Sequence, residues 1–300
     1  MTKIRKSGNS SMIQDRRGRS SGGGGGLGGM LGGGGGGGLN LPTKMGGGVV
    51  GILIALAVLF LPKLLNGSGA NNQAVDTGTN SGAESTNACD TETAQIVCGA
   101  TEDVQAFWKR EFASRGETYT DTQTVFFSGG TDTGCGAASS STGPFFCPAD
   151  NLVYIDLDFL VQLQNQFNAQ GDLASQYIVA HEYGHYVQDL LGINAKMSEA
   201  QQQQPDRANE FSVALELQAD CLAGVWANDA NSRGQLDSPS EVNEALNAAA
   251  AVGDDRIQQT TQGRVDPESF THGTSEQRMT WFKRGYDTGD RDQCNTFAEL

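Results

Sequence analysis

The sequence predicts a mainly helical α+β domain with a small β element, preceded by one transmembrane helix. Three observations support this prediction. Residues 46–65 form an apolar run whose one charge is Lys63, two short segments are rich in β-branched and aromatic residues, and apolar residues recur at helical spacing over most of the chain beyond residue 100. The 300 residues therefore divide into a tail, a membrane segment, a linker and one folded domain.

The tail, residues 1–45, is basic and rich in glycine. Residues 1–44 carry seven Lys and Arg against one Asp, and residues 1–48 hold 19 of the 41 glycines. A segment of this composition has too few apolar side chains to bury a core. We expect it to be disordered.

Residues 46–65 are long enough to cross a membrane, because 20 residues at about 1.5 Å rise per residue span the roughly 30 Å of a hydrocarbon core. The basic tail before them predicts a single-pass protein of the cytoplasmic (inner) membrane with its N-terminus in the cytoplasm. The domain that follows would then be periplasmic or extracellular. A cleaved signal peptide is the alternative, since Ser68, Gly69 and Ala70 are small. The apolar run exceeds the usual length of about 7–15 residues, which favours an uncleaved anchor.

Residues 66–88 are polar and typical of a flexible linker, and we place the folded domain at residues 89–300. Residues 66–300 hold 12 basic against 34 acidic side chains, and the whole chain has a formal charge of -15. An acidic surface repels phosphate, so the composition excludes nucleic acid as a partner of the domain.

Six cysteines, all beyond residue 88, agree with export. An even number of cysteines in an oxidising compartment predicts disulfide bonds, and six cysteines allow 15 pairings. The short spacings favour Cys89–Cys98 and Cys135–Cys147, which leaves Cys221–Cys294.

Helices dominate the expected domain. The first is predicted over 102–114, where Thr101 offers a helix N-cap before two acidic residues. Short strands are predicted over 123–127 and 152–155, with a long Gly/Ser loop between them. Further helices are expected over 156–169, 173–191, 206–229, 239–251 and 275–285.

The helix over 173–191 contains the string His-Glu-Tyr-Gly-His. His181 and His185 are four residues apart, so they lie on one helical face and can bind one metal ion. Glu182 points about 100° away and can reach a water molecule instead of the metal. Zinc lowers the pKa of such a water towards about 7, and a carboxylate can take its proton as the water attacks a carbonyl. The string therefore predicts zinc-dependent hydrolysis.

A third protein ligand is needed, and the next long helix offers candidates. Glu216 and Asp220 are again four residues apart, among apolar neighbours. We expect Glu216 to bind the metal and Asp220 to accept the N–H of a ligand histidine. Glu210 is the competing ligand, but it lies six residues before Glu216 and so falls on a different face of the helix.

Several longer segments resemble the bacterial, membrane-anchored neutral zinc metallopeptidase family. They are HEYGHYVQ, LELQADCLAGVWA, HGTSEQRMTWFKRG and CGAASSSTGPFFCPADNLVYIDLDF, together with DRRG at residues 15–18 before the apolar segment. The resemblance covers nearly the whole chain and implies a zincin-like metallopeptidase domain. HExxH with a later ExxxD is similar to the gluzincin group, which implies His181, His185 and Glu216 as ligands of one Zn²⁺, Glu182 as base and Asp220 as partner of a ligand histidine.

His272 stands in a segment that resembles the H-P-x-x-x-x-R pattern of another gluzincin branch, with Gly273 in place of proline and Arg278 at its end. Two interpretations compete. His272 donates a hydrogen bond to the oxyanion of the reaction as a catalytic residue, or it only precedes the helix that follows. We expect Arg278 to hold a core carboxylate.

These observations favour a membrane-anchored zinc endopeptidase that acts on peptides or proteins. Strand 152–155 is a candidate edge for pairing with an extended substrate. Two alternatives stay open: a zinc-stabilised, non-proteolytic scaffold of the envelope, and a hydrolase of a non-peptide amide such as a cell-wall crosslink. The sequence predicts neither the natural substrate nor the oligomeric state.

Overall fold

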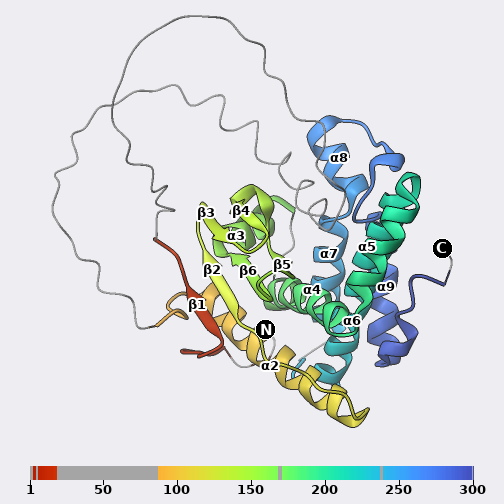
Figure 1. Ribbon diagram of the computed structural model, residues 1–300. Coiled ribbons are helices and arrows are strands. Elements are labelled where there is room, and N and C mark those ends of the chain that lie inside the picture. The colour runs from red at the N-terminus through yellow and green to blue at the C-terminus, as the bar shows by residue number, and fades with distance from the viewer. Residues whose placement is uncertain (1–2, 5, 19–86, 168–170, 237–238, 299) are drawn as a thin grey trace, which may run out of the picture.

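The computed structural model describes residues 3–4, 6–18, 87–167, 171–236, 239–298 and 300 (Figure 1). The predicted transmembrane helix over 46–65 and most of the predicted linker lie outside the described residues. Within the described ranges, no helix combines the length and the hydropathy that crossing a membrane requires.

The described part is mainly helical with a small sheet, which confirms the predicted α+β class. The helices are α2 (Glu92–Ser114), α3 (Leu157–Phe167), α4 (Asp172–Leu190), α5 (Ile193–Gln203), α6 (Ala208–Ser232), α7 (Pro239–Ala251), α8 (Asp254–Gln262) and α9 (Ser275–Thr288). The strands are β1 (Ile13–Asp15), β2 (Thr124–Phe127), β3 (Gly130–Thr133), β4 (Gly136–Ser139), β5 (Phe145–Cys147) and β6 (Leu152–Asp156).

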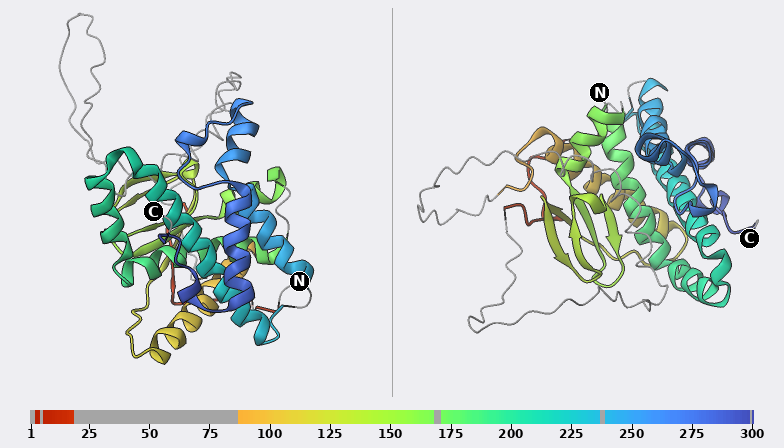
Figure 2. Two further views of the ribbon diagram at one scale, coloured as in Figure 1. Left: turned by 90° about the vertical axis from the view of Figure 1, so that its right-hand side faces the viewer. Right: turned by 90° about the horizontal axis from the view of Figure 1, so that it is seen from above.

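The main sheet has the order β1-β2-β6-β5. β1 and β6 run parallel to β2, with Thr124 opposite Val153, and β5 runs antiparallel to β6. Figure 2 shows the sheet on one side of α4 and the layer of α6 and α9 on the other. Helix α4 therefore lies in the middle of the fold, and 15 of its 19 residues are buried.

The chain before residue 19 departs from the prediction of a disordered tail. β1 pairs with β2, and Ile4 is 3% exposed. Arg17 donates to Asp15 and to Asp90, so the basic residues of this segment are tied to the acidic domain. The prediction is therefore wrong for the described residues up to Gly18. A strand of three residues has too little apolar alternation to stand out in a basic, polar segment.

This pairing requires β1 and β2 to lie on the same side of any membrane. It cannot coexist, within one chain, with an N-terminus in the cytoplasm and a domain outside. We expect the double variant Gln14→Cys/Val125→Cys to form a fourth disulfide in the exported full chain, because these two residues lie directly opposite each other in the parallel pair and the six native cysteines are all paired. Peptide mapping without reductant detects the bond.

The matched control is Gln14→Cys with Gln203→Cys, which lies on α5 across the molecule (Figure 1). We expect two free thiols in that variant. Free thiols at 14 and 125, or a bond that joins two chains, would show that β1 does not pair with β2 of its own chain.

Helix α2 begins ten residues before the predicted start. Thr91 is its N-cap and accepts from the amide of Ala94, whereas Thr101, the predicted cap, is buried in the helix and bonds to Thr124. The earlier start follows from packing, because Ile96, Val97 and the disulfide-bonded Cys98 are buried. All three predicted disulfide pairings are confirmed: Cys89–Cys98, Cys135–Cys147 and Cys221–Cys294.

The Gly/Ser segment between the two predicted strands is more ordered than expected. It contains the hairpin β3–β4 and the strand β5. Because β5 lies outside β6, strand β6 is internal, and the prediction that 152–155 forms a free edge is wrong. Helices α5 and α8 are two further elements that the sequence did not predict. The predicted bounds of the other helices agree with the structure to within three residues at either end.

Two close helix crossings position the functional residues. A Cβ at Gly184 would lie 3.1 Å from the backbone of Ala219, so α4 and α6 cross at van der Waals distance. A Cβ at Gly285 would lie 1.9 Å from the carbonyl oxygen of Cys221, so α9 packs directly on α6. Glycine lowers helix stability by about 1 kcal/mol relative to alanine, but only glycine permits approach this close. The two crossings bring residues of α4, α6 and α9 to one point.

Candidate metal centre

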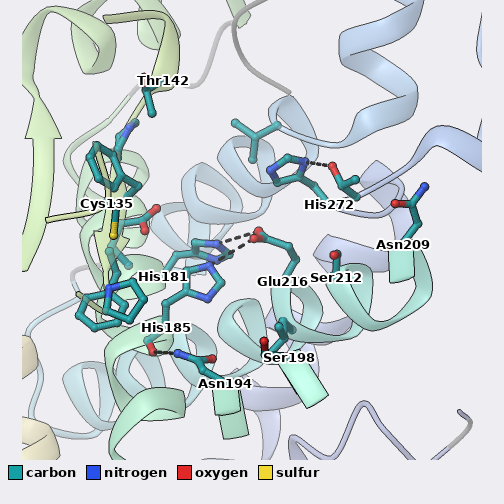
Figure 3. Close-up of a pocket in the computed structure, with 18 of the residues that line it drawn as sticks. Cys135, Thr142, His181, His185, Asn194, Ser198, Asn209, Ser212, Glu216 and His272 are labelled. Atoms are coloured by element: carbon teal, nitrogen blue, oxygen red, sulfur yellow. Dashed lines mark hydrogen bonds and ion pairs between the residues drawn. The ribbon is translucent and has the colours of Figure 1, made fainter. Parts of the chain in front are cut away.

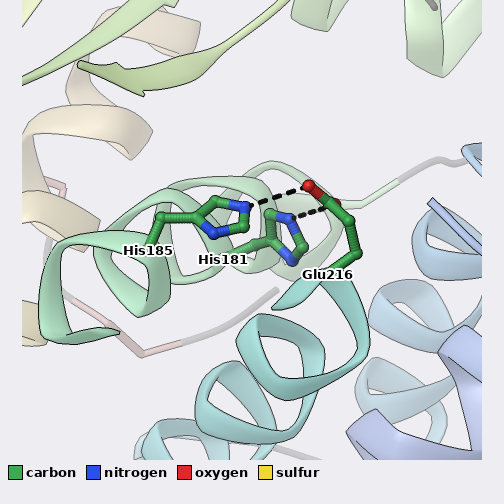
Figure 4. Close-up of side chains that lie close together, drawn as sticks. All are labelled: His181, His185 and Glu216. Atoms are coloured by element: carbon green, nitrogen blue, oxygen red, sulfur yellow. Dashed lines mark hydrogen bonds and ion pairs between the residues drawn. The ribbon is translucent and has the colours of Figure 1, made fainter. Parts of the chain in front are cut away.

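His181, His185 and Glu216 come together where α4 crosses α6 (Figure 4). The Nε2 atom of His181 lies 3.1 Å from Oε2 of Glu216, and Nε2 of His185 lies 3.3 Å from Oε1. One ligand atom from each residue lies within 4.8 Å of the others. The structure thus brings together the three residues that the sequence predicted as ligands.

In each imidazole ring Nε2 faces Glu216, and a hydrogen-bond partner of Nδ1 orients the ring. Nδ1 of His181 lies 2.8 Å from Oδ1 of Asp220, which is fully buried, so the proton on Nδ1 is held there and Nε2 is the nitrogen that can offer a lone pair to a metal. Nδ1 of His185 lies 2.8 Å from Oε1 of Gln188. Gln188 donates from Nε2 to the carbonyl of Leu215, so its Oε1 faces the ring and must accept. Gln188 was missed by sequence reasoning, although it stands one helical turn beyond His185.

Arg278 of α9 binds Asp220, the carboxylate that orients His181. It is 3% exposed, and its Nε and Nη2 donate to the two oxygens of Asp220 at 2.8 and 3.0 Å. The hydroxyl of Tyr177 donates to the same carboxylate. Burial raises the pKa of Asp220, but Arg278 and His181 lower it more, so that its pKa lies below the usual range. Asp220 is therefore a fixed anion that orients His181.

The metal-binding group fits zinc. Two imidazoles and one carboxylate are a ligand set that zinc accepts, and three protein ligands leave a fourth tetrahedral position for water. Burial lowers the pKa of His181, but Asp220 and Glu216 raise it more, to about 10. A metal ion needs the neutral ring, so its binding must displace this proton. The competing ligand Glu210 is exposed and pairs with Arg207, outside the group.

Glu182 lies next to the ligands but does not belong to the group of three. Its side chain is buried and lines the same cleft as His181, His185 and Glu216. Burial raises the pKa of Glu182, and the two neighbouring histidines only partly offset this. A carboxylate with a raised pKa is a better proton acceptor than an exposed one.

His272 lines the cleft from the loop before α9 (Figure 3). Asp254 holds it: Oδ1 lies 3.2 Å from Nδ1 of His272, and Oδ2 accepts the backbone amides of Thr271, His272 and Gly273. Gly273 has φ +85°, which proline cannot adopt, and it donates an amide that proline lacks. The departure from the H-P pattern is therefore a requirement of this loop. The sequence did not single out Asp254.

Three tyrosines that the sequence favoured as core residues do pack in the core. Tyr183 is fully buried and bonds to Thr124, Tyr154 donates to Asp150, and Tyr186 donates to the carbonyl of Thr120. None of the three is among the residues that line the cleft. Tyr177, which the sequence did not single out for a role, does line it.

Comparisons with known proteins place the chain in a family. The chain matches the family described as "Putative neutral zinc metallopeptidase" over residues 2–297. It is 44% identical over 268 residues to the uncharacterized protein YpfJ of Escherichia coli (strain K12), a match that covers 87% of this chain and 89% of YpfJ. It is 47% identical over 205 residues to an uncharacterized protein of Mycobacterium tuberculosis, Rv2575, covering 65% of this chain and 67% of that one. No solved structure matches the chain. The match over nearly the whole length shows that the chain belongs to this zinc metallopeptidase family.

Proposed function

We propose that the protein is a zinc-dependent endopeptidase that binds one Zn²⁺ through His181, His185 and Glu216. The observation that carries the proposal is the common direction of the two Nε2 atoms, which both face the Glu216 carboxylate while both Nδ1 atoms are held by protein acceptors. Zinc bound there supplies Lewis acidity to the substrate carbonyl and to a water molecule.

Glu182 is the proposed general base. It takes a proton from the water as the water oxygen bonds to the carbonyl carbon, and it then gives that proton to the leaving amine as the C–N bond breaks. Its burial in the cleft supports this role, because a desolvated carboxylate has a raised pKa and holds the proton between the two steps.

His272 is the proposed donor to the oxyanion that forms on the carbonyl oxygen. Asp254 accepts from Nδ1, so Nε2 donates towards the cleft only when the ring is protonated on both nitrogens. Burial lowers the pKa of His272, but Glu216 and Asp254 raise it more, so that the imidazole keeps its proton to a higher pH. A preformed donor in a partly desolvated cleft typically contributes two to three orders of magnitude to the rate.

This assignment predicts the effect of Asp254→Asn on the pH profile. Activity that needs protonated His272 falls as the pH rises through the pKa of His272. Because Asp254 raises that pKa, its removal should move the alkaline limb of kcat/KM to lower pH, while the acidic limb stays in place. Asp266→Asn, an exposed substitution in the same loop region, should leave both limbs unchanged. An alkaline limb that does not move would exclude His272 as the titrating donor.

The free edge of the sheet at β5 supports binding of an extended peptide. β5 has β6 on one side and no strand on the other among the described residues, and Phe145 and Phe146 line the cleft. A substrate strand could add its main-chain hydrogen bonds to this edge. The candidate edge for pairing with a substrate is therefore β5, and not the predicted segment 152–155, which lies in β6.

We infer that the domain works in an oxidising compartment outside the cytoplasm. Three disulfides support this, because such bonds are rare in a reducing cytosol. The acidic composition supports peptides and not nucleic acid as partners. Membrane attachment through residues 46–65, with the N-terminus in the cytoplasm, stays a prediction that conflicts with the pairing of β1 and β2, and the cysteine crosslink described above decides between them.

The test is cleavage of an unstructured peptide library by the zinc-loaded full chain, with mass spectrometry of the products. We expect cleavage that a chelator abolishes and added Zn²⁺ restores. Stoichiometric zinc with no cleavage of peptides would overturn the proposal and favour a scaffold. Cleavage of murein fragments without cleavage of linear peptides would instead favour the non-peptide amide.

A further inference from the structure

The cleft at the metal centre has a volume of about 1130 Å³ and two chemically different walls (Figure 3). One wall, which we call the polar wall, comes from α5 and the first turns of α6. It consists of Asn194, Ser198, Gln201, Asn209 and Ser212. The α5 members are spaced by four and three residues, and the α6 members lead with the same helical spacing to Glu216. Each helix therefore presents one uncharged polar stripe to the cleft.

The amides of the polar wall have a fixed orientation. Asn194 donates from Nδ2 to the carbonyl of His185, Gln201 from Nε2 to that of Ala208, and Asn209 from Nδ2 to that of Glu268. A carbonyl can only accept, so the nitrogens are assigned without ambiguity. Among the described residues, nothing donates to the three amide oxygens, so they remain as acceptors for N–H groups of a ligand.

The opposite wall is apolar. Phe146 of β5, Phe159 of α3 and Ile178 of α4 line it, and each is less than 10% exposed. These side chains come from the sheet side of the fold, next to the free edge at β5. They offer a surface for an apolar side chain and no partner for a polar one.

Neither wall carries a charge. The charged side chains that line the cleft are Glu182, Glu216 and Arg278 at the metal centre, together with His272 in its protonated form, which belongs to neither wall. This is notable in a chain with 55 charged residues and a net charge of -15. A charged substrate side chain would lose water on entering this cleft and gain no counter-ion away from the metal, which is costly.

We propose that this cleft selects peptide segments whose residues on both sides of the scissile bond are uncharged, with an apolar side chain against Phe146, Phe159 and Ile178. On the other side, N–H donors of the substrate bind the amide oxygens of the polar wall. The proposal rests on the proposed endopeptidase function and names its substrate class.

The first test is the frequency of each residue at the positions flanking the cuts, measured with the zinc-loaded full chain and a peptide library of equal residue content. We expect Asp, Glu, Lys and Arg to be depleted at the two positions on either side of the bond. Enrichment of acidic or basic residues there would overturn the inference while leaving the peptidase intact. No cleavage at all would instead refute the proposed function.

The second test adds a charge to the polar wall. Ser198 carries no essential bond, since its hydroxyl only accepts from Gln202 at 3.5 Å. We expect Ser198→Asp to favour substrates with Lys or Arg, and Ser198→Lys to favour Asp or Glu, each by roughly tenfold in relative kcat/KM for an ion pair near a protein surface.

Gln203→Asp and Gln203→Lys are the matched controls. Gln203 is exposed and lies on the opposite face of α5, five residues beyond Ser198. These variants should cleave the same bonds as the wild type. If the Ser198 variants show no change of preference, or if the Gln203 variants show the same change, the polar wall does not contact substrate.

Discussion

Replacing Glu182 with Gln should reduce kcat/KM for peptide hydrolysis by about 10²–10⁴-fold, the range typical of general acid–base catalysis, without loss of zinc. Gln has the same size and fits the same buried position, but it cannot take a proton from water. Glu182 lies outside the group of three ligands, so the metal content should stay at one ion per chain. Steady-state kinetics on the best library peptide and metal analysis of the same sample measure both quantities.

The matched control for this prediction is Glu199→Gln, the same change on the exposed face of α5. It should leave kcat/KM unchanged. If Glu182→Gln lost its zinc, Glu182 would be a ligand and the base would have to be sought elsewhere. If it kept both zinc and activity, the mechanism through Glu182 would be wrong.

The parts of the site that lie on one helix were predictable from sequence. His181 and His185 share a face because an α-helix has 3.6 residues per turn, and the same periodicity joins Glu216 to Asp220. That the two pairs meet depends on the crossing at Gly184, which local periodicity does not encode. The need of a zinc site for a third ligand predicted this step, and the resemblance to a known family supported it.

The residues that orient the side chains of His272 and His185 were harder to predict from the sequence. Asp254 reaches His272 across 18 residues, and Gln188 works only because Leu215 fixes its amide from another helix. Asp254 has no spacing relation to His272, whereas Gln188 stands one turn beyond His185 and only the orientation of its amide depends on a tertiary contact. Asparagine, glutamine and aspartate are also frequent on solvated faces, so their type alone indicates no role.

The same reason explains which elements of the fold were missed. The long helices carry enough apolar residues to show their period, as in α4 and α6. β1, β3 and β4 have three or four residues each, and β3 and β4 together include Gly130, Gly136 and several small polar residues. Their strands form because neighbours and the Cys135–Cys147 bond hold them. In short strands, pairing and not propensity decides the structure.

Arg278→Met should lower the free energy of unfolding by about 3–5 kcal/mol, because it leaves the fully buried Asp220 as a charge without its main partner. Met has a similar length but no donor. Arg278 holds the pKa of Asp220 below its usual range, so the pair stabilises the fold above the pKa of an unfolded aspartate, about 4, and this contribution is lost as the pH falls further. Denaturant unfolding at neutral pH measures the change.

Lys283→Met on the same helix is the control, since it breaks an exposed pair with Asp287 and should cost less than about 1 kcal/mol. The double variant Asp220→Asn/Arg278→Met separates charge from packing. If the buried charge is the cause, the double variant should be more stable than the sum of the two single losses predicts. Strictly additive losses would show that Arg278 acts through packing alone. In that case His181 would keep its orientation without Arg278, and zinc affinity would not change in Arg278→Met.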